Sequence, residues 1–220
     1  MRCPECGSFI DYKNRNRCSR WPICRFVDNS AKNIKLERYI VFDLETSGFN
    51  RKEDRIIEIG AVLVEQGMII KRFDKLCNPG KFISATISEV TNITNDMLKN
   101  AETEKRVVKE FVKFVSETNT EICIGHNIKR FDTPFFTNAC KRAGVKNPFK
   151  YQLDTMNLAI SLKLKERGLV ANNKQPTLAE YYNIKYEAHR AINDVEALSQ
   201  IFAYMAKEAG DNLQLQVENI

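Results

Sequence analysis

Two acidic side chains within one short apolar segment are the first candidates for chemistry. Asp43 and Glu45 lie two positions apart in Arg38–Glu45, a segment whose pattern predicts a β-strand. Side chains two positions apart leave the same face of a strand, so these carboxylates should lie only a few ångströms from each other. Like charges at that range repel and raise a pKa unless divalent cations neutralise them. The pair predicts a metal site, and the alternative is a strand end whose acids are solvated.

A third acid lies on a helix predicted from about Arg190 to Lys207. Asp194 is in register with the apolar stripe that should pack on the sheet, so its carboxylate is directed toward the core. Burial of an unpaired carboxylate is costly, so Asp194 requires a basic partner, the usual structural answer, or a metal ion. His189 precedes this helix, and its imidazole is either structural or a base for the same site.

Asp132 has two interpretations. The segment Asp132-Thr133-Pro134 is typical of a helix start, because Asp is a good N-cap and Pro is tolerated in the first turn. As a cap, Asp132 needs no catalytic role. As a further carboxylate near the other acids, it would complete a cluster that holds two metal ions.

Four of the seven cysteines lie in the first 24 residues. Cys3 and Cys6 are separated by two residues, eleven residues then precede Cys18, and five separate it from Cys24. An odd number of cysteines does not favour a disulfide framework, whereas spaced thiols in a reducing compartment commonly hold metal. We therefore predict one structural Zn²⁺, which would supply folding free energy to a segment too short for its own core. The other three are interpreted as ordinary buried thiols: Cys77, Cys123 and Cys140.

Much of the net charge of +6 comes from residues 1–38, which contain nine basic and four acidic residues. Trp21 is interleaved with arginines there, so the segment offers stacking faces and phosphate contacts to a nucleic acid. A purely structural zinc unit or a protein-docking unit is the alternative. No apolar run approaches the roughly 20 residues that span a bilayer, and the start has no signal-like apolar stretch. We expect a cytoplasmic protein without a membrane partner.

The hydrophobic periodicity predicts one α/β domain. Strands at Arg38–Glu45, Arg55–Gln66 and Met68–Cys77 should form an antiparallel meander. Helices are then predicted near 104–116, 132–144, 154–165, 176–182 and 190–207, with strands near 121–125 and 151–153. Strands first, followed by alternating helices and strands, indicate a mixed sheet. The predicted organisation is a cysteine module at 1–26, a linker at 27–37, the main domain at 38–208 and a tail at 209–220.

Together these residues resemble the DnaQ-like 3′-to-5′ exonucleases of the RNase H-like superfamily, in the group whose signature is four acids and a histidine. The matching motifs are Ile40–Gly48 with Arg55–Ala61, then Gly125–Phe136, then Ala188–Asp194. The spacing of His189 and Asp194 is that of the histidine group, because the tyrosine group would place Tyr where Arg190 stands. One departure is the three residues between Asn127 and Phe131, where many members of the family have two.

The resemblance implies an RNase H-like mixed five-stranded sheet flanked by helices, and a metal-dependent enzyme that releases 5′-mononucleotides. Two Mg²⁺ or Mn²⁺ ions, roughly 3.5–4 Å apart, would be held by four acids: Asp43, Glu45, Asp132 and Asp194. His189 would deprotonate the attacking water. The substrate contacts expected in the main domain are Thr46, Phe49, His126, Asn127 and Phe131. Phe49 and Phe131 could stack on terminal bases, although a place in the core is an equal alternative.

The cysteine segment resembles the zinc finger repeated at the C-terminus of type IA DNA topoisomerases, which is associated with single-stranded DNA. Both resemblances favour DNA, preferentially single-stranded, as the substrate, and a DNA polymerase or repair complex as a candidate partner. Two alternatives stay open. One is an RNA exonuclease, because metal–phosphate chemistry is indifferent to the sugar without a 2′-OH contact. The other is an inactive nucleic-acid-binding scaffold, which the complete set of signature residues disfavours.

Overall fold

The computed structural model describes residues 10–11, 17–18, 36–186, 190–210, 213 and 216–220. Within the cysteine segment, β1 (Ile10–Asp11) pairs antiparallel with β2 (Arg17–Cys18). The side chains expected to form or flank the zinc site all lie outside the described part: Cys3, Cys6, Cys18, Cys24 and Trp21. The zinc site therefore stays a prediction.

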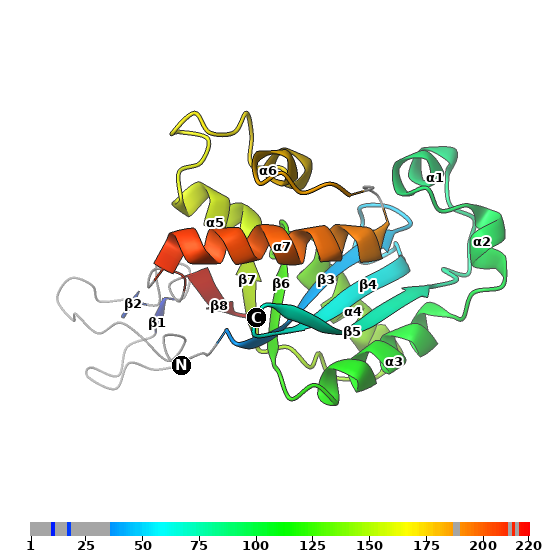
Figure 1. Cartoon of the computed structure of the whole chain (residues 1–220). Coiled ribbons are helices and arrows are strands. Elements are labelled where there is room, and N and C mark those ends of the chain that lie inside the picture. Colours follow the sequence, from blue (N-terminus) through cyan, green and yellow to red (C-terminus); the bar gives the residue numbers. More distant parts are fainter. Residues whose placement is uncertain (1–9, 12–16, 19–35, 187–189, 211–212, 214–215) are drawn as a thin grey trace.

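A six-stranded sheet with the order β5-β4-β3-β6-β7-β8 forms the centre of the main domain (Figure 1). Its strands are β3 (Arg38–Thr46), β4 (Ile56–Glu65), β5 (Met68–Leu76), β6 (Ile122–Gly125), β7 (Tyr151–Asp154) and β8 (Val217–Asn219). The first three form the predicted antiparallel meander, whereas β6 and β7 run parallel to β3. The expected mixed α/β architecture is thus confirmed.

The expectation of five strands was one too few. Val217–Asn219 pairs antiparallel with β7, within a segment that the sequence pattern assigns to a tail. A strand of three residues, of which only Val217 is buried, has no periodicity to detect. Two short helices, α1 (Ala85–Thr91) and α2 (Asn95–Lys99), were also missed, because each buries only one residue and so has no apolar stripe to detect. Ser84 and Thr94 cap them through their side chains.

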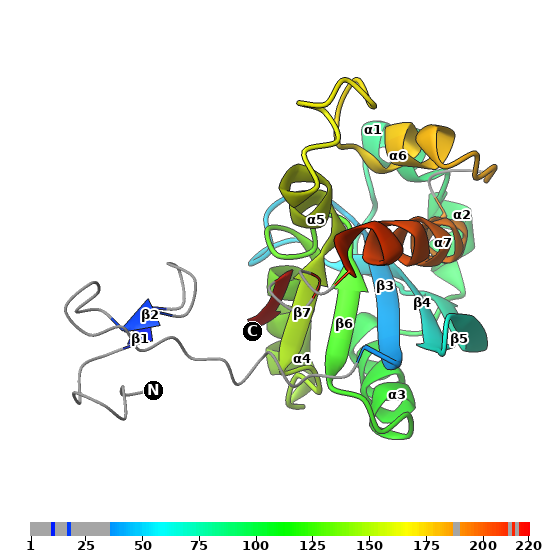
Figure 2. The ribbon, with the colours of Figure 1, turned by 60° about the vertical axis from the view of Figure 1, so that its left-hand side comes forward.

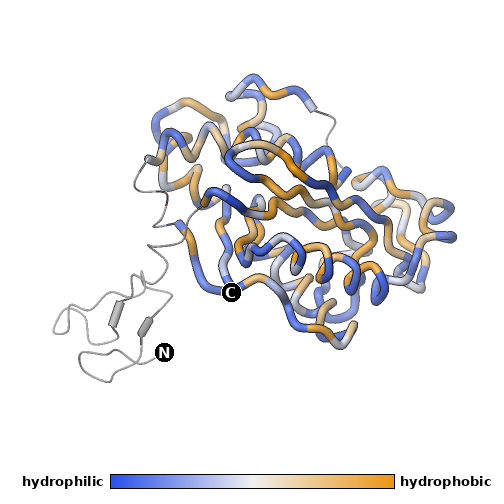
Figure 3. The backbone as a smooth tube through the Cα atoms, turned by 60° about the horizontal axis from the view of Figure 1, so that its bottom comes forward, coloured by the Kyte–Doolittle hydropathy of each residue, from blue (hydrophilic) through white to orange (hydrophobic). Residues whose placement is uncertain are grey.

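Helices cover both faces of the sheet (Figure 2). On one face lie α3 (Glu104–Ser116) and α4 (Asp132–Ala143), and on the other lie α5 (Thr155–Ser161), α6 (Gln175–Tyr181) and α7 (Ala191–Ala209). Apolar residues run along the central strands between these layers (Figure 3). Asp154 caps α5 as predicted by accepting a hydrogen bond from Met156 N–H, but this helix ends four residues before the expected Lys165.

The alternation along β3 determines which side chains meet which helices. Ile40, Phe42 and Leu44 belong to the core beneath α3 and α4, whereas Tyr39 and Val41 belong to the core beneath α7. Because side chains alternate along a strand, the acids at positions 43 and 45 face α7. In the described residues no helix is long and apolar enough to cross a membrane.

Candidate active site

Three acidic side chains converge where β3 approaches α7. Asp43, Glu45 and Asp194 each contribute one carboxylate oxygen to a group in which all three oxygens lie within 4.8 Å of one another. Asp43 and Glu45 come from one face of β3, and Asp194 comes from the first turn of α7, about 150 residues later. The structure thus brings together three of the four acids that the sequence selects.

A buried ion pair fixes the N-terminus of α7 over the sheet. Glu58 lies opposite Glu45 on β4 and is 0% exposed. Its Oε1 accepts hydrogen bonds from Arg190 Nε at 3.0 Å and Nη2 at 2.8 Å, and its Oε2 accepts one from Ala191 N–H at 2.9 Å. Since Arg190 is the N-cap residue of α7, this carboxylate holds the helix start that carries Asp194. The sequence offered one signal for it, a single acid inside the apolar run of β4.

Gly60 permits the close approach of α7 to β4. It pairs with Asp43 in the sheet, and a Cβ at this position would lie 2.3 Å from the carbonyl carbon of Ala191. No side chain fits at that distance, so helix and strand touch backbone to backbone beside the acids. A second support comes from α6, where Gln175 Nε2 donates to the carbonyl oxygen of Asp194 at 2.9 Å and to its Oδ1 at 3.2 Å.

The electrostatics of the three acids favour a bound cation. Burial, and then the charges of Asp194 and Glu58, raise the pKa of Asp43 to about 7. Burial and the charges of Asp43, Asp194 and Glu58 raise the pKa of Glu45 to about 9, although Arg190 opposes this shift. These acids therefore retain protons near neutral pH unless a positive charge replaces them. A set of carboxylate oxygens alone suits a hard divalent cation such as Mg²⁺ or Mn²⁺.

Asp132 supports this site in a different way from the one expected. The N-cap of α4 is Phe131, without a side-chain cap, so the prediction that Asp132 caps this helix is wrong. Asp132 is buried, and its Oδ1 instead accepts a hydrogen bond from Leu44 N–H at 3.1 Å, between the two acids of β3. Burial and the charge of Asp43 raise its pKa well above the ordinary value. Its carboxylate is near the group of three but outside it.

The expected substrate-binding residues differ in their contacts. Phe49 is 84% exposed in the loop that follows β3, and its ring meets that of the half-buried Phe131 edge-on, with centroids 6.3 Å apart. Thr46 is buried and donates its hydroxyl hydrogen to the Gly48 carbonyl at 2.7 Å. The alternative of a place in the core is therefore excluded for Phe49 but describes Phe131 in part, because Phe131 packs against the core beneath α3 and α4. Thr46 stabilises a turn.

The other two residues expected to bind substrate make internal contacts. His126 Nδ1 lies 3.0 Å from Thr155 Oγ1, and burial lowers the pKa of this imidazole to about 4, so it is neutral. Asn127 adopts a left-handed φ of 58° and donates its N–H to Asp154 Oδ1 at 3.0 Å. The three residues between Asn127 and Phe131 form a turn, in which the N–H groups of Arg130 and Phe131 both donate to the Asn127 carbonyl oxygen. His189, the expected base, lies outside the described residues.

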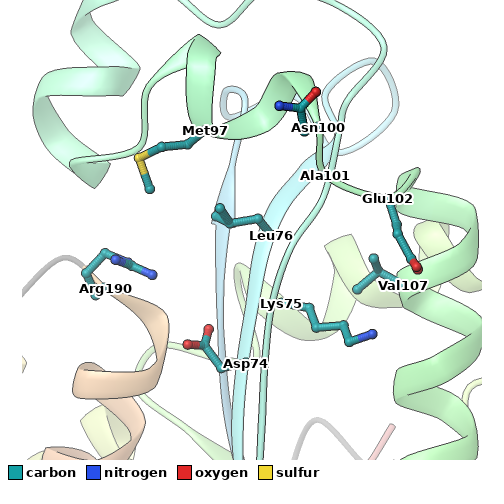
Figure 4. A pocket seen from close by; sticks show the side chains of 9 residues that line it. All are labelled: Asp74, Lys75, Leu76, Met97, Asn100, Ala101, Glu102, Val107 and Arg190. Carbon is teal, nitrogen blue, oxygen red and sulfur yellow. The ribbon is translucent and has the colours of Figure 1, made fainter.

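A pocket of about 520 Å³ is lined in part by Arg190, the residue that precedes α7 (Figure 4). Asp74 on β5 lies across from Arg190, while Met97 and Asn100 come from α2 and its C-terminal cap. Acidic and basic groups alternate around this pocket. Arg190 therefore lines the pocket and also donates hydrogen bonds to the buried Glu58.

Comparison with known proteins identifies the family. The family described as Exonuclease, RNase_T, matches residues 40–202, which contain both acids of β3, Asp132 and Asp194. The chain belongs to this exonuclease family. The prediction of a 3′-to-5′ exonuclease is confirmed, and the four motifs that carried the resemblance lie within the matched region.

Curated relatives of this exonuclease include much longer proteins. It is 36% identical over 190 residues to the DNA polymerase III PolC-type of Staphylococcus epidermidis, and 36% identical over 183 residues to that of Bacillus subtilis. These alignments cover 84% and 81% of this chain but only 13% and 12% of the polymerases. The exonuclease therefore corresponds to a small part of each polymerase.

Solved structures share its fold. E. coli Exonuclease I in complex with a dT13 oligonucleotide has a TM-score of 0.69 at 16% identity, covering 79% of this chain and 42% of that one. Exonuclease X in complex with 5′-overhanging duplex DNA has a TM-score of 0.61 at 19% identity, covering 81% and 96%. A 3′-exonuclease that recognises a histone mRNA stem-loop has a TM-score of 0.64 at 16% identity, covering 84% and 70%.

Proposed function

We propose that this exonuclease removes 5′-mononucleotides from the 3′ end of DNA, preferentially single-stranded, by a two-metal-ion mechanism. The observation that carries the proposal is the group of three carboxylates from β3 and α7. The repulsion between these carboxylates does not stabilise the fold. They are nevertheless held together by the buried ion pair of Arg190 with Glu58 and by the close contact of Gly60 with α7. Such an arrangement is expected where cations bind.

Asp43, Glu45 and Asp194, with Asp132 beside them, would hold two Mg²⁺ or Mn²⁺ ions. When bound, these ions neutralise the charge that develops on the scissile phosphate and on the departing 3′ oxygen. His189 is the proposed base that takes a proton from the attacking water. Asp132 also fixes the end of β3 through Leu44 N–H, which keeps the two strand acids aligned.

The exposed ring of Phe49, with the half-buried ring of Phe131 beside it, is proposed to position the terminal bases by stacking, a contact that tolerates any sequence. His126, Asn127 and Thr46 would act mainly by shaping the backbone around that pair, since their described contacts are internal. The cysteine segment, with Zn²⁺ on its four cysteines and Trp21 nearby, would retain the strand.

Similarity to polymerases favours DNA and a replication or repair complex as the setting. The relatives at 36% identity are DNA polymerases, and two structures with this fold contain DNA. RNA is the second candidate, supported by the 3′-exonuclease that recognises an mRNA stem-loop with a comparable TM-score.

Parallel digestion of end-labelled DNA and RNA oligonucleotides of one sequence, with Mg²⁺ or with EDTA, tests the proposal. We expect 5′-mononucleotides from the 3′ end of DNA, slower cleavage of RNA, and no product in EDTA. Asp43→Ala should abolish cleavage, while Asp96→Ala, which removes an exposed acid of α2, should not. Cleavage by Asp43→Ala at the wild-type rate would refute the site, and faster cleavage of RNA would reverse the choice of substrate.

A further inference from the structure

A second pocket, of about 400 Å³, lies between the loop that follows β3, helix α4 and the β7–β8 edge of the sheet. Three cations line it, Arg51 and Lys52 from the loop and Lys129 from the turn before α4. The other lining residues include amides and hydroxyls, and none of the lining side chains is acidic. A concave surface with this composition is suited to an anion.

The walls of this pocket are held by specific contacts. Asp54 organises the loop by accepting hydrogen bonds from Asn50 N–H at 2.9 Å and from Lys81 Nζ at 2.8 Å. Asn138 of α4 donates from Nδ2 to the Arg51 carbonyl at 3.1 Å, so the loop is attached to the helix. The cations therefore project from a defined frame, which lowers the entropic cost of binding a ligand.

The charge of these cations is largely available to a ligand. In the described part of the chain, neither Arg51 nor Lys52 lies within ion-pair distance of a carboxylate, and both are exposed. Lys129 forms an ion pair with Glu218 of β8. The pocket in Figure 4 differs, because its cations Lys75 and Arg190 are already paired with Glu110 and Glu58.

The pocket shares its chain segments with the proposed stacking rings. Arg51 follows Phe49 by two residues, and Lys129 precedes Phe131 by two, so each ring of the contacting pair has a cation of the pocket two positions away in the chain. Thr133, which lines the pocket, follows Asp132 directly. A strand whose terminal base lies against the rings would bring its further phosphates to this side of α4.

We propose that this pocket is a phosphate-binding subsite for the single-stranded DNA that extends away from the scissile bond. Glu218 on β8 is an internal anion that competes with the strand for Lys129. This inference rests on the proposed function, because it assumes that a nucleic-acid strand occupies the active site. Beyond the proposed function, it names the residues that bind the strand past the reacting nucleotide, and it identifies the Lys129–Glu218 ion pair as a contact that weakens this binding.

Equilibrium binding of the full-length chain to a fluorescent 12-nucleotide single strand tests the subsite, in Ca²⁺ to prevent turnover. Each lost phosphate contact should lower affinity roughly fourfold at 0.15 M salt and reduce the slope of log K against log salt by about 0.7. The double variant Arg51→Ala, Lys52→Ala is therefore expected to bind roughly fifteenfold more weakly. Lys71→Ala removes an exposed cation from β5, at the opposite edge of the sheet, and should have little effect.

Glu218→Gln gives the opposite result because it releases Lys129 from its internal partner. We expect tighter binding, by up to roughly fourfold, with a steeper salt slope. A variant that only damaged the fold would not produce a gain. Unchanged or weaker binding by Glu218→Gln, or equal losses in the double variant and in Lys71→Ala, would overturn the subsite.

Cleavage of a trinucleotide separates this inference from the proposed function. Such a short substrate reaches the acids but leaves few phosphates for the pocket, so the double variant should cleave it at the wild-type rate. If the wild-type enzyme leaves both trinucleotide and 12-mer intact, the proposed function fails. If it cleaves both, and the double variant binds the 12-mer as tightly as wild type, only the subsite fails.

Discussion

The carboxylate group uses β3 and the cationic pocket uses the loop that follows it, but the charges of the two sets are held in different ways. The acids repel one another in a partly buried position and depend on anchors from β4, α6 and α7. The cations of the pocket are exposed and require only a braced loop and one turn. Buried charges are sensitive to small displacements, whereas exposed charges act additively and are screened by salt.

The largest effect should follow from Asp194→Asn, which keeps the size of the side chain but removes its charge. Since this residue supplies one of three clustered oxygens, its loss should lower kcat by roughly 10³-fold, as is typical when a group that stabilises transition-state charge is removed. Single-turnover cleavage of the 12-mer at saturating Mg²⁺ measures it. Asp96→Asn, at an exposed acid of α2, is the matched control, and a fall of less than tenfold in Asp194→Asn would contradict the comparison.

The anchor of α7 should be the next most sensitive feature. Arg190→Met leaves Glu58 buried without its cation, so the free energy of unfolding should fall by about 3 kcal/mol. Glu58→Gln should cost less, because the charge that it leaves behind is partly solvated. Because the displaced helix carries Asp194, kcat should also fall, by roughly 10-fold to 100-fold. Denaturant unfolding in EDTA and single-turnover kinetics measure the two effects.

A surface pair provides the control for this anchor. Arg72 on β5 pairs with Glu196 of α7, joining the same helix to the sheet, but both side chains are substantially exposed. Arg72→Met should therefore cost less than about 1 kcal/mol and leave kcat unchanged. Equal destabilisation by Arg72→Met and Arg190→Met would show that burial does not distinguish the two pairs.

The acids should also make the metal-free protein sensitive to pH. The pKa values of Asp43 and Glu45 rise on folding to about 7 and about 9, so the folded protein binds these protons more tightly than the unfolded chain. Their contribution to stability is therefore fully present below about pH 4 and is lost as the pH rises through 7 to 9. In EDTA, Tm should be lower at pH 8 than at pH 5, and Mg²⁺ should remove most of that difference.

A neutral variant tests whether these acids cause the pH effect. Asp43→Asn should raise Tm in EDTA at pH 8 by a few degrees and abolish the gain from Mg²⁺, because one of the repelling charges is gone. Glu89→Gln, which removes an exposed acid from α1, should leave both quantities unchanged. A wild-type Tm in EDTA that does not fall between pH 5 and pH 8 would contradict this prediction.

The sequence predicts the meander and the acids well because these features have strong local patterns. Strand alternation alone places Asp43 and Glu45 on one face, and the helical stripe of α7 directs Asp194 toward them. The five-residue helix α2 and the three-residue strand β8 escape detection because they are too short to show a hydrophobic periodicity. Their positions depend on long-range pairing, such as the contact of β8 with β7.

Partners across the fold are the part of the site that the sequence cannot specify. Glu58 stands out as an acid in an apolar strand, but its partner Arg190 is 132 residues away and becomes apparent only in three dimensions. Asp132 has the local pattern of a helix cap, yet tertiary contacts direct its carboxylate to Leu44 N–H, 88 residues away. The cations Arg51, Lys52 and Lys129 resemble any solvated surface residues until the pocket unites them.

The smallest effect is expected at the aromatic pair that lies between the two regions in the chain. Phe49 is 84% exposed, so Phe49→Ala should leave stability almost unchanged but remove a stacking face for the terminal base. Base stacking is worth roughly 1–3 kcal/mol, and at so exposed a ring we expect the lower end, about a fivefold weaker affinity for the 12-mer. Because stacking is uncharged, the salt slope should not change, in contrast to the cation variants. Phe82 is 87% exposed in the segment before α1, and Phe82→Ala is the matched control. If Phe49→Ala and Phe82→Ala bind the 12-mer with equal affinity, the position of Phe49 beside the acids has no effect on binding. Phe49 would then have no role in the substrate path.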